Sequence, residues 1–91
     1  MRIFMDVDGA RRVVRQMREA AQQHQTRARR LQTHLQQLQQ HWEGDAPRVY
    51  MERQQAHLRR IQQYVQTLLH LADTLEREID QYLRMDILDE F

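Results

Sequence analysis

Four residue types are missing from this chain: serine, cysteine, lysine and asparagine do not occur. Without cysteine there is no disulfide and no thiolate metal site, and the sequence gives no indication of the redox compartment. The missing serine, cysteine and lysine remove most of the side chains that enzymes activate as nucleophiles. The chain has only 2 glycines, so it holds no glycine-rich loop. We therefore expect no enzymatic activity and no cofactor.

Long apolar runs are also missing. No stretch approaches the roughly 18 apolar residues that a membrane-spanning helix needs. The N-terminal Met-Arg-Ile-Phe-Met-Asp-Val-Asp has no apolar core of the kind found in secretory signal peptides. We expect no such signal, so export, if it occurs, would use another route. Membrane contact through an amphipathic helix is not expected either, because helix packing explains the apolar positions better.

Neither sign of charge dominates, because 14 arginines oppose 13 acidic residues and the net charge is +1. This balance gives no overall field that would attract nucleic acid. The charge is nevertheless uneven: residues 1–44 carry eight Arg and four acids, whereas residues 73–91 carry two Arg and seven acids. The densest basic cluster, Arg27, Arg29 and Arg30, has no interleaved aromatic residue and is interpreted as a solvated face. No nucleic-acid partner is expected.

Helix-breaking residues are scarce, and two of the three lie close together. Gly44 and the single proline, Pro47, closely follow the only tryptophan, Trp42. A glycine just past one helix and a proline just inside the next are the usual punctuation between helices. The segment 42–45 therefore predicts the bend of a helical hairpin, with Asp45 as the N-cap of the second helix.

Before the bend, apolar residues recur at alternating spacings of three and four, the heptad pattern of a helix that packs along one seam. This pattern predicts a helix over about 9–41, with Asp8 as its N-cap and Asp6 as an alternative. One polar residue, His24, lies in the seam and is interpreted as a polar layer that fixes the register. The seam consists of Ala10, Val14, Met17, Ala21, His24, Ala28, Leu31, Leu35, Leu38 and Trp42.

After the bend, the same pattern predicts a second helix over about 46–85. A further row lies beside its seam at a spacing of seven, and Leu69 and Leu83 widen the other flank. The stripe is wider than one neighbouring helix can cover, which predicts association with another subunit. The seam consists of Met51, Gln54, Leu58, Ile61, Val65, Leu68, Ala72, Leu75, Ile79 and Tyr82, and the further row of Tyr50, His57, Tyr64 and Leu71.

The next seam position is Asp86, and a core does not accept an unpaired carboxylate. We expect the buried stripe to end at Tyr82 and residues 86–91 to form a flexible acidic tail. The whole chain, 1–91, is read as one all-α domain, an antiparallel two-helix hairpin that dimerises into a four-helix bundle.

Charges and histidines add two expectations. Folding at the bend brings an arginine cluster beside the acids of the second helix, which favours the antiparallel arrangement, although these charges would also match across a dimer. The arginines are Arg11, Arg12, Arg15 and Arg18, and the acids are Glu76, Glu78 and Asp80.

No two histidines lie three or four residues apart in the sequence, so no metal site is expected.

Two short sequence motifs lie at the bend and at the end of the second predicted helix. Trp42-Glu43-Gly44 fits W-x-G at the midpoint, and Tyr82-Leu83-Arg84-Met85-Asp86 fits Y-x-x-x-[D/E] at the end of the second helix. In these motifs and in its length the chain resembles the WXG-motif family of about 100 residues, the early-secreted-antigen-like substrates of type VII (ESX) secretion. The resemblance covers essentially the whole chain.

The resemblance implies a hairpin that dimerises and is exported, folded, by a membrane machine with a motor ATPase. It also implies that this machine reads the tail with Tyr82 and Asp86, together with the W-x-G bend of the partner subunit, the segment that contains Trp42 and Gly44. Because one chain carries both motifs, a homodimer or higher homo-oligomer is favoured, with a WXG-type paralogue as the alternative partner. The protein would be cytoplasmic before export and secreted or surface-bound afterwards. The alternative function is a cytoplasmic coiled-coil adaptor or assembly module with no export role.

Overall fold

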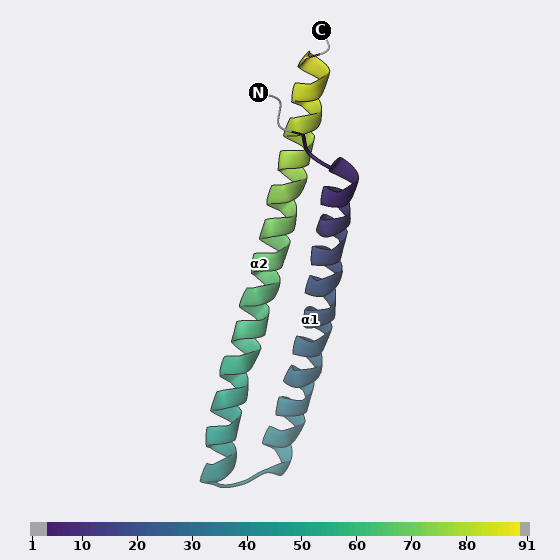
Figure 1. Cartoon of the computed structure of the whole chain (residues 1–91). Coiled ribbons are helices and arrows are strands. Elements are labelled where there is room, and N and C mark those ends of the chain that lie inside the picture. Colours follow the sequence, from purple (N-terminus) through teal and green to yellow (C-terminus); the bar gives the residue numbers. More distant parts are fainter. Residues whose placement is uncertain (1–3, 90–91) are drawn as a thin grey trace.

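Two long helices make up the described structure (Figure 1). The computed structural model describes residues 4–89, without the side chains of residues 45–47 and 86–89. Helix α1 spans Val7–His41, helix α2 spans Asp45–Asp89, and residues 42–44 join them. The helices run antiparallel and side by side in a hairpin of 72 × 18 × 14 Å. The predicted all-α helical hairpin is confirmed.

The start of α1 is fixed by an N-cap. Asp6 has extended backbone angles, and its carboxylate accepts a hydrogen bond of 3.0 Å from the backbone N–H of Gly9. The helix therefore begins at Val7, two residues before the predicted start, and Asp6 rather than Asp8 is the cap. A Cβ at position 9 would collide with the Asp6 carboxylate, so this close approach suits a glycine.

The bend combines an extended residue with a left-handed glycine. Trp42 has φ −119° and ψ 132°, and Gly44 has φ 110°, which L side chains rarely adopt. Because Trp42 leaves the helical path, it does not continue the buried seam, contrary to the sequence prediction. Trp42 is 51% exposed, and its ring packs edge-on against that of Tyr50, with 6.2 Å between the ring centroids.

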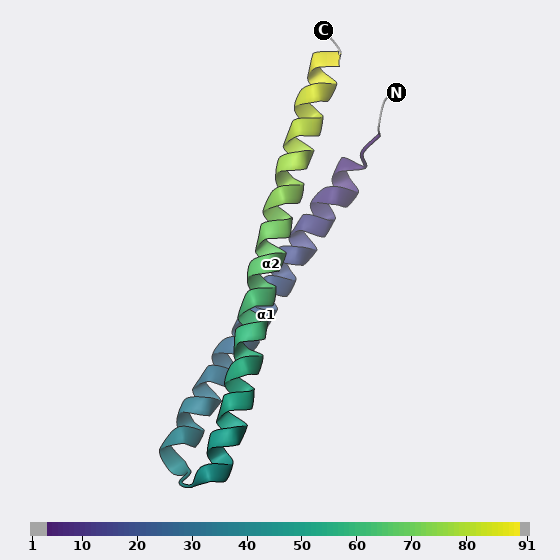
Figure 2. The same ribbon diagram turned by 90° about the vertical axis from the view of Figure 1, so that its left-hand side faces the viewer.

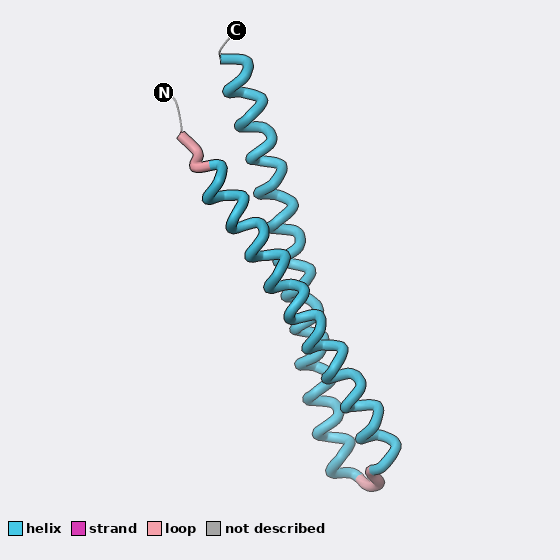
Figure 3. Tube along the Cα trace, turned by 90° about the vertical axis from the view of Figure 1, so that its right-hand side faces the viewer, coloured by secondary structure: helices cyan, strands magenta, loops and turns pink. Residues whose placement is uncertain are grey.

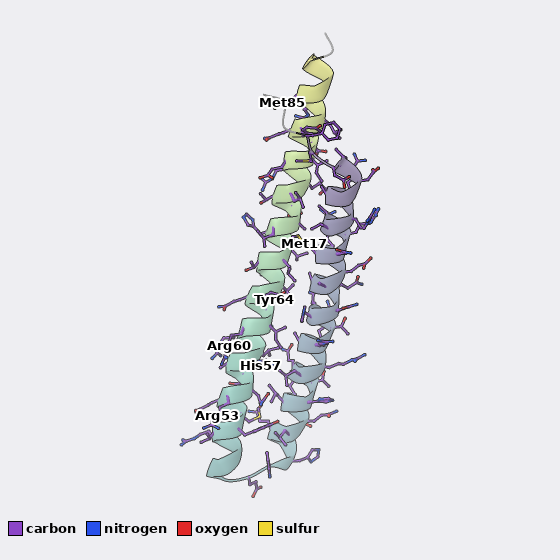
Figure 4. The ribbon with its side chains drawn as sticks, in the orientation of Figure 1. Met17, Arg53, His57, Arg60, Tyr64 and Met85 are labelled. Carbon is purple, nitrogen blue, oxygen red and sulfur yellow. The ribbon has the colours of Figure 1, made fainter. Side chains whose placement is uncertain are left out.

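Helix α2 extends four residues past its predicted end near residue 85, to Asp89. No glycine or proline follows Pro47, so nothing in the sequence interrupts the helical backbone. The first residues of the expected flexible tail are therefore helical, whereas residues 90–91 lie outside the described part. The end of α2 projects past the start of α1, as seen at Met85, which is 66% exposed (Figure 4).

The core is a single heptad row from each helix. The views from the two sides show α1 and α2 crossing gradually along their length (Figures 2 and 3). This wrapping keeps residues at a spacing of seven in the contact between two helices. The buried residues are Val14, Ala21, Ala28 and Leu35 from α1, and Val65, Ala72 and Ile79 from α2.

A small core leaves a large surface. The accessible area is 7857 Å², whereas a compact monomer of 11.2 kDa exposes about 5,700 Å². Three of the seven buried residues are alanines, which contribute little apolar area. The isolated hairpin therefore exposes about 2,000 Å² more surface than a compact domain of its size.

One arginine ties the two helices together near their open end. Arg18 of α1 forms ion pairs with Asp73, at 3.3 Å, and with Glu76, both on α2. The hydrogen bond to Glu76, and to a smaller extent the one to Asp73, raises the pKa of Arg18 above its ordinary value. The predicted attraction between the arginine cluster of α1 and the acids of α2 is thus present at Arg18.

Candidate functional site

The hairpin presents one apolar side. In an antiparallel pair, the half-buried rows of both helices point to the same side of the contact. The edge-on contact of His24 with Tyr64, at 5.1 Å between ring centroids, fixes this side across the two helices. We define the apolar face as Met17, His24, Leu31 and Leu38 of α1 together with Tyr50, His57, Ile61, Tyr64, Leu68, Leu71 and Leu75 of α2.

Large side chains remain accessible on the apolar face. Tyr50, Tyr64 and Leu71 are 46%, 50% and 47% exposed, and they recur every seven or fourteen residues along α2. In Figure 4, Met17 lies between the helices and Tyr64 lies over α2, while Arg53 and Arg60 lie toward the edge of α2 that is away from α1. A continuous row of exposed aromatic and aliphatic groups is typical of a protein-interaction surface.

The structure distributes the residues of the predicted seam over three levels of burial. Val14, Ala21, Ala28, Leu35, Val65, Ala72 and Ile79 are buried, whereas Trp42 of the seam and Tyr50 and Tyr64 of the further row are exposed. The remaining members are half-buried, which means that α1 and α2 cover only part of each. They are Ala10, Met17, His24, Leu31, Leu38, Met51, Gln54, Leu58, Ile61, Leu68, Leu75 and Tyr82.

The opposite side of the hairpin is polar and hollowed. A groove of about 530 Å³ runs between the helices, with the buried Ala28 and Val65 as its floor. Its walls are glutamines and two arginines, Arg29 and Arg59. We define the Gln–Arg groove as Gln25, Ala28, Arg29, Gln32, Arg59, Gln62, Gln63, Val65 and Gln66.

The two motif positions lie at opposite ends of the hairpin. Trp42 and Gly44 line a shallow cavity at the bend, to which Leu38, Arg48 and Met51 also contribute. Tyr82 is half-buried near the end of α2, one turn before Asp86, whose side chain lies outside the described part. The spacing of four puts these two residues on one side of the helix.

Sequence reasoning missed the groove. Arg29 was assigned to a solvated cluster, and Arg59 was not singled out, because the two arginines are thirty positions apart. The available signal was an absence: residues 20–42 and 53–72 contain no Asp or Glu, and the hairpin lays these stretches side by side. Only the antiparallel pairing of the helices brings these two stretches without carboxylates together on one surface.

Two absences hold for the described residues. No cluster of three or more His, Asp or Glu side chains in that part of the chain has the geometry of a metal site. Neither α1 nor α2, over the residues described, has a segment long and apolar enough to cross a membrane.

Comparison with known families gives a clear assignment. The model of the WXG100 family, "Proteins of 100 residues with WXG", matches residues 2–87. The chain belongs to the WXG100 family. WXG100 proteins are non-enzymatic helical secretion substrates, and membership is consistent with such a role here. No curated protein and no solved structure gives a significant match.

Proposed function

We propose that this WXG100 protein is a non-enzymatic substrate of a type VII (ESX-like) secretion system, which acts as a dimer of hairpins. The observation that best supports this proposal is the apolar face, because the neighbouring helix of the same hairpin covers its side chains only in part. A second copy laid on this face would complete a four-helix bundle. The excess of about 2,000 Å² over a compact monomer is comparable to what one subunit buries in an obligate dimer.

Charge supports association with another copy in antiparallel orientation. The bend half, residues 20–72, has seven Arg and three acids, a net charge of +4. The open half, residues 1–19 and 73–91, has seven Arg and ten acids, a net charge of −3. Two antiparallel copies bring each basic half beside an acidic half, whereas parallel copies superimpose like charges. A homodimer therefore needs no second gene product to satisfy its charges.

The dimer is tested by two leucines on opposite sides of α2. Leu71 belongs to the apolar face, whereas Leu69, two residues earlier, points about 160° away from it, given roughly 100° per residue. We expect Leu71→Glu to convert the dimer to monomer, because it would bury a carboxylate without a partner. Leu69→Glu should leave the dimer intact. Size-exclusion chromatography with light scattering measures the mass against 11.2 kDa for the monomer.

Two other results would contradict the dimer. Equal masses for both variants would show that the apolar face is not the interface. A monomeric wild-type protein that becomes a stable complex only with a WXG-type paralogue would replace the homodimer by a heterodimer.

Recognition by the secretion machine is proposed to involve Tyr82 and Asp86, with the bend at Trp42 and Gly44 as a second contact. Tyr82 and Asp86 are four residues apart, which puts them on one side of α2, and the end of this helix projects past the start of α1 (Figure 1). A motor ATPase would therefore reach this end of the helix without opening the hairpin.

The signal is tested by Tyr82→Ala in a host that carries the secretion system. We expect the secreted fraction to disappear while helicity and dimer mass remain, because Tyr82 lies at the margin of the core. Arg84→Gln, at an unspecified position of the same motif, should be exported normally. Normal export of Tyr82→Ala would reject the signal. Retention of the wild-type protein in the cell would favour the cytoplasmic adaptor instead.

A further inference from the structure

The bend half of the hairpin carries arginines without neighbouring carboxylates. Residues 20–42 and 53–72 hold six Arg and no Asp or Glu, and all five histidines. The contact of His24 with Tyr64, and the shared groove floor of Ala28 and Val65, show that these two stretches lie against each other. By contrast, Arg18 in the open half is paired with two acids.

Arg29 and Arg59 concentrate this charge in the Gln–Arg groove. The nearest carboxylate to Arg59 along α2 is Glu52, two turns away, or about 10 Å at 1.5 Å per residue. The nearest to Arg29 along α1 is Glu19, about 15 Å away. Two guanidinium groups that face one groove repel each other, and an anionic group between them would replace that repulsion by attraction.

We propose that the Gln–Arg groove binds an acidic segment of a protein partner. The planar guanidinium of arginine pairs with carboxylates through two parallel hydrogen bonds. The glutamine amides both donate and accept hydrogen bonds, so they match the N–H and C=O groups of a peptide backbone. A groove of about 530 Å³, open along the hairpin, accommodates several residues of such a segment.

The lining of the groove disfavours a nucleic acid. Single strands are held by aromatic side chains on which bases stack, and no aromatic residue lines this groove. Duplex DNA requires many phosphate contacts, whereas the groove offers two arginines and the whole chain has a net charge of +1. A carboxylate-bearing peptide matches both the arginine and the glutamine side chains that line the groove.

The groove lies on the side of the hairpin opposite the apolar face. A four-helix bundle formed through that face would leave the groove accessible on each outer surface. The proposal goes beyond the proposed function and does not depend on it. If the protein proved monomeric, the groove would still be present in each hairpin.

The test is a binding titration of the full chain with a fluorescein-labelled oligo-glutamate peptide, followed by fluorescence anisotropy at about 0.05 M salt. The site variant is Arg29→Gln with Arg59→Gln. The matched control is Arg30→Gln with Arg60→Gln, which removes the same charge from adjacent positions that do not line the groove. Helicity and mass are checked for all three proteins.

We expect saturable binding that the site variant weakens at least tenfold, roughly the loss of one charged hydrogen bond. The control should weaken it by no more than about twofold, through the general field. Equal losses in both variants would show diffuse attraction and overturn the proposal, as would the absence of saturable binding. Tighter binding of oligothymidylate of the same charge, also lost in the site variant, would assign the groove to nucleic acid instead.

Discussion

Replacement of Ile79 by alanine tests whether the single buried row holds the hairpin together. Ile79 is 2% exposed and forms a cluster with Val14 and Ala72. Truncation of a buried isoleucine to alanine costs about 2–5 kcal/mol, and the cost is lower where the site can collapse or admit water. Ile79 borders a cleft that Arg11 and Arg15 also line, so solvent can reach the space that the side chain vacates. We therefore expect about 2–3 kcal/mol.

The assay is urea and thermal unfolding followed by far-UV circular dichroism. A loss of about 2–3 kcal/mol lowers the melting temperature of a domain of this size by roughly 8–24 °C. Because association would add concentration-dependent stability, both proteins are compared at several matched concentrations. Leu69→Ala, which truncates a residue 37% exposed, serves as the control. A cost below about 1 kcal/mol for Ile79→Ala, or one equal to the control, would refute the single-row core.

The two helix boundaries give further predictions. Gly44→Ala should lower the free energy of unfolding by about 1–2 kcal/mol through backbone strain, because φ is 110° there while no atom lies within 4 Å of the new Cβ. A loss no larger than that of the control variant Glu43→Ala would contradict this strain. Asp6→Ala should cost about 1 kcal/mol through loss of the N-cap, and amide hydrogen exchange should quicken in the first turn of α1. Asp6→Asn should retain most of that protection, and faster exchange along the whole of α1 would argue against a local cap.

The hairpin could be predicted from the sequence because its determinants are local. The alternating apolar spacing predicts both helices, and the segment from Trp42 to Pro47 predicts the bend between them. The first boundary was less certain because Asp6 and Asp8 are equally good caps by residue type, and only the hydrogen bond to Gly9 distinguishes them. The end of α2 was predicted too early because the acidic segment 86–91 was expected to be flexible once burial ended at Tyr82, whereas loss of burial does not end a helix.

The faces were harder to predict than the helices. Heptad positions indicate which residues point inward, but not how much of each row one neighbouring helix covers. Trp42 fits the spacing, yet its extended backbone removes it from the row. The Gln–Arg groove forms because Arg29 of α1 and Arg59 of α2 line the same space across the hairpin. The apolar periodicity within one helix does not indicate which residues of the other helix lie opposite.

The bend also orders the folding of the chain. Contacts that join the two arms of the hairpin run from Trp42 at the bend with Tyr50 of α2, eight residues apart, to Arg18 of α1 with Glu76 of α2, 58 residues apart. The entropy lost on closing a loop rises with loop length, so contacts beside the bend form at lower cost and prepare those further out. The hairpin should therefore close like a zipper from Gly44. By the same reasoning, a pull on the C-terminus meets the last-formed contacts first and peels α2 from α1 starting at the open end.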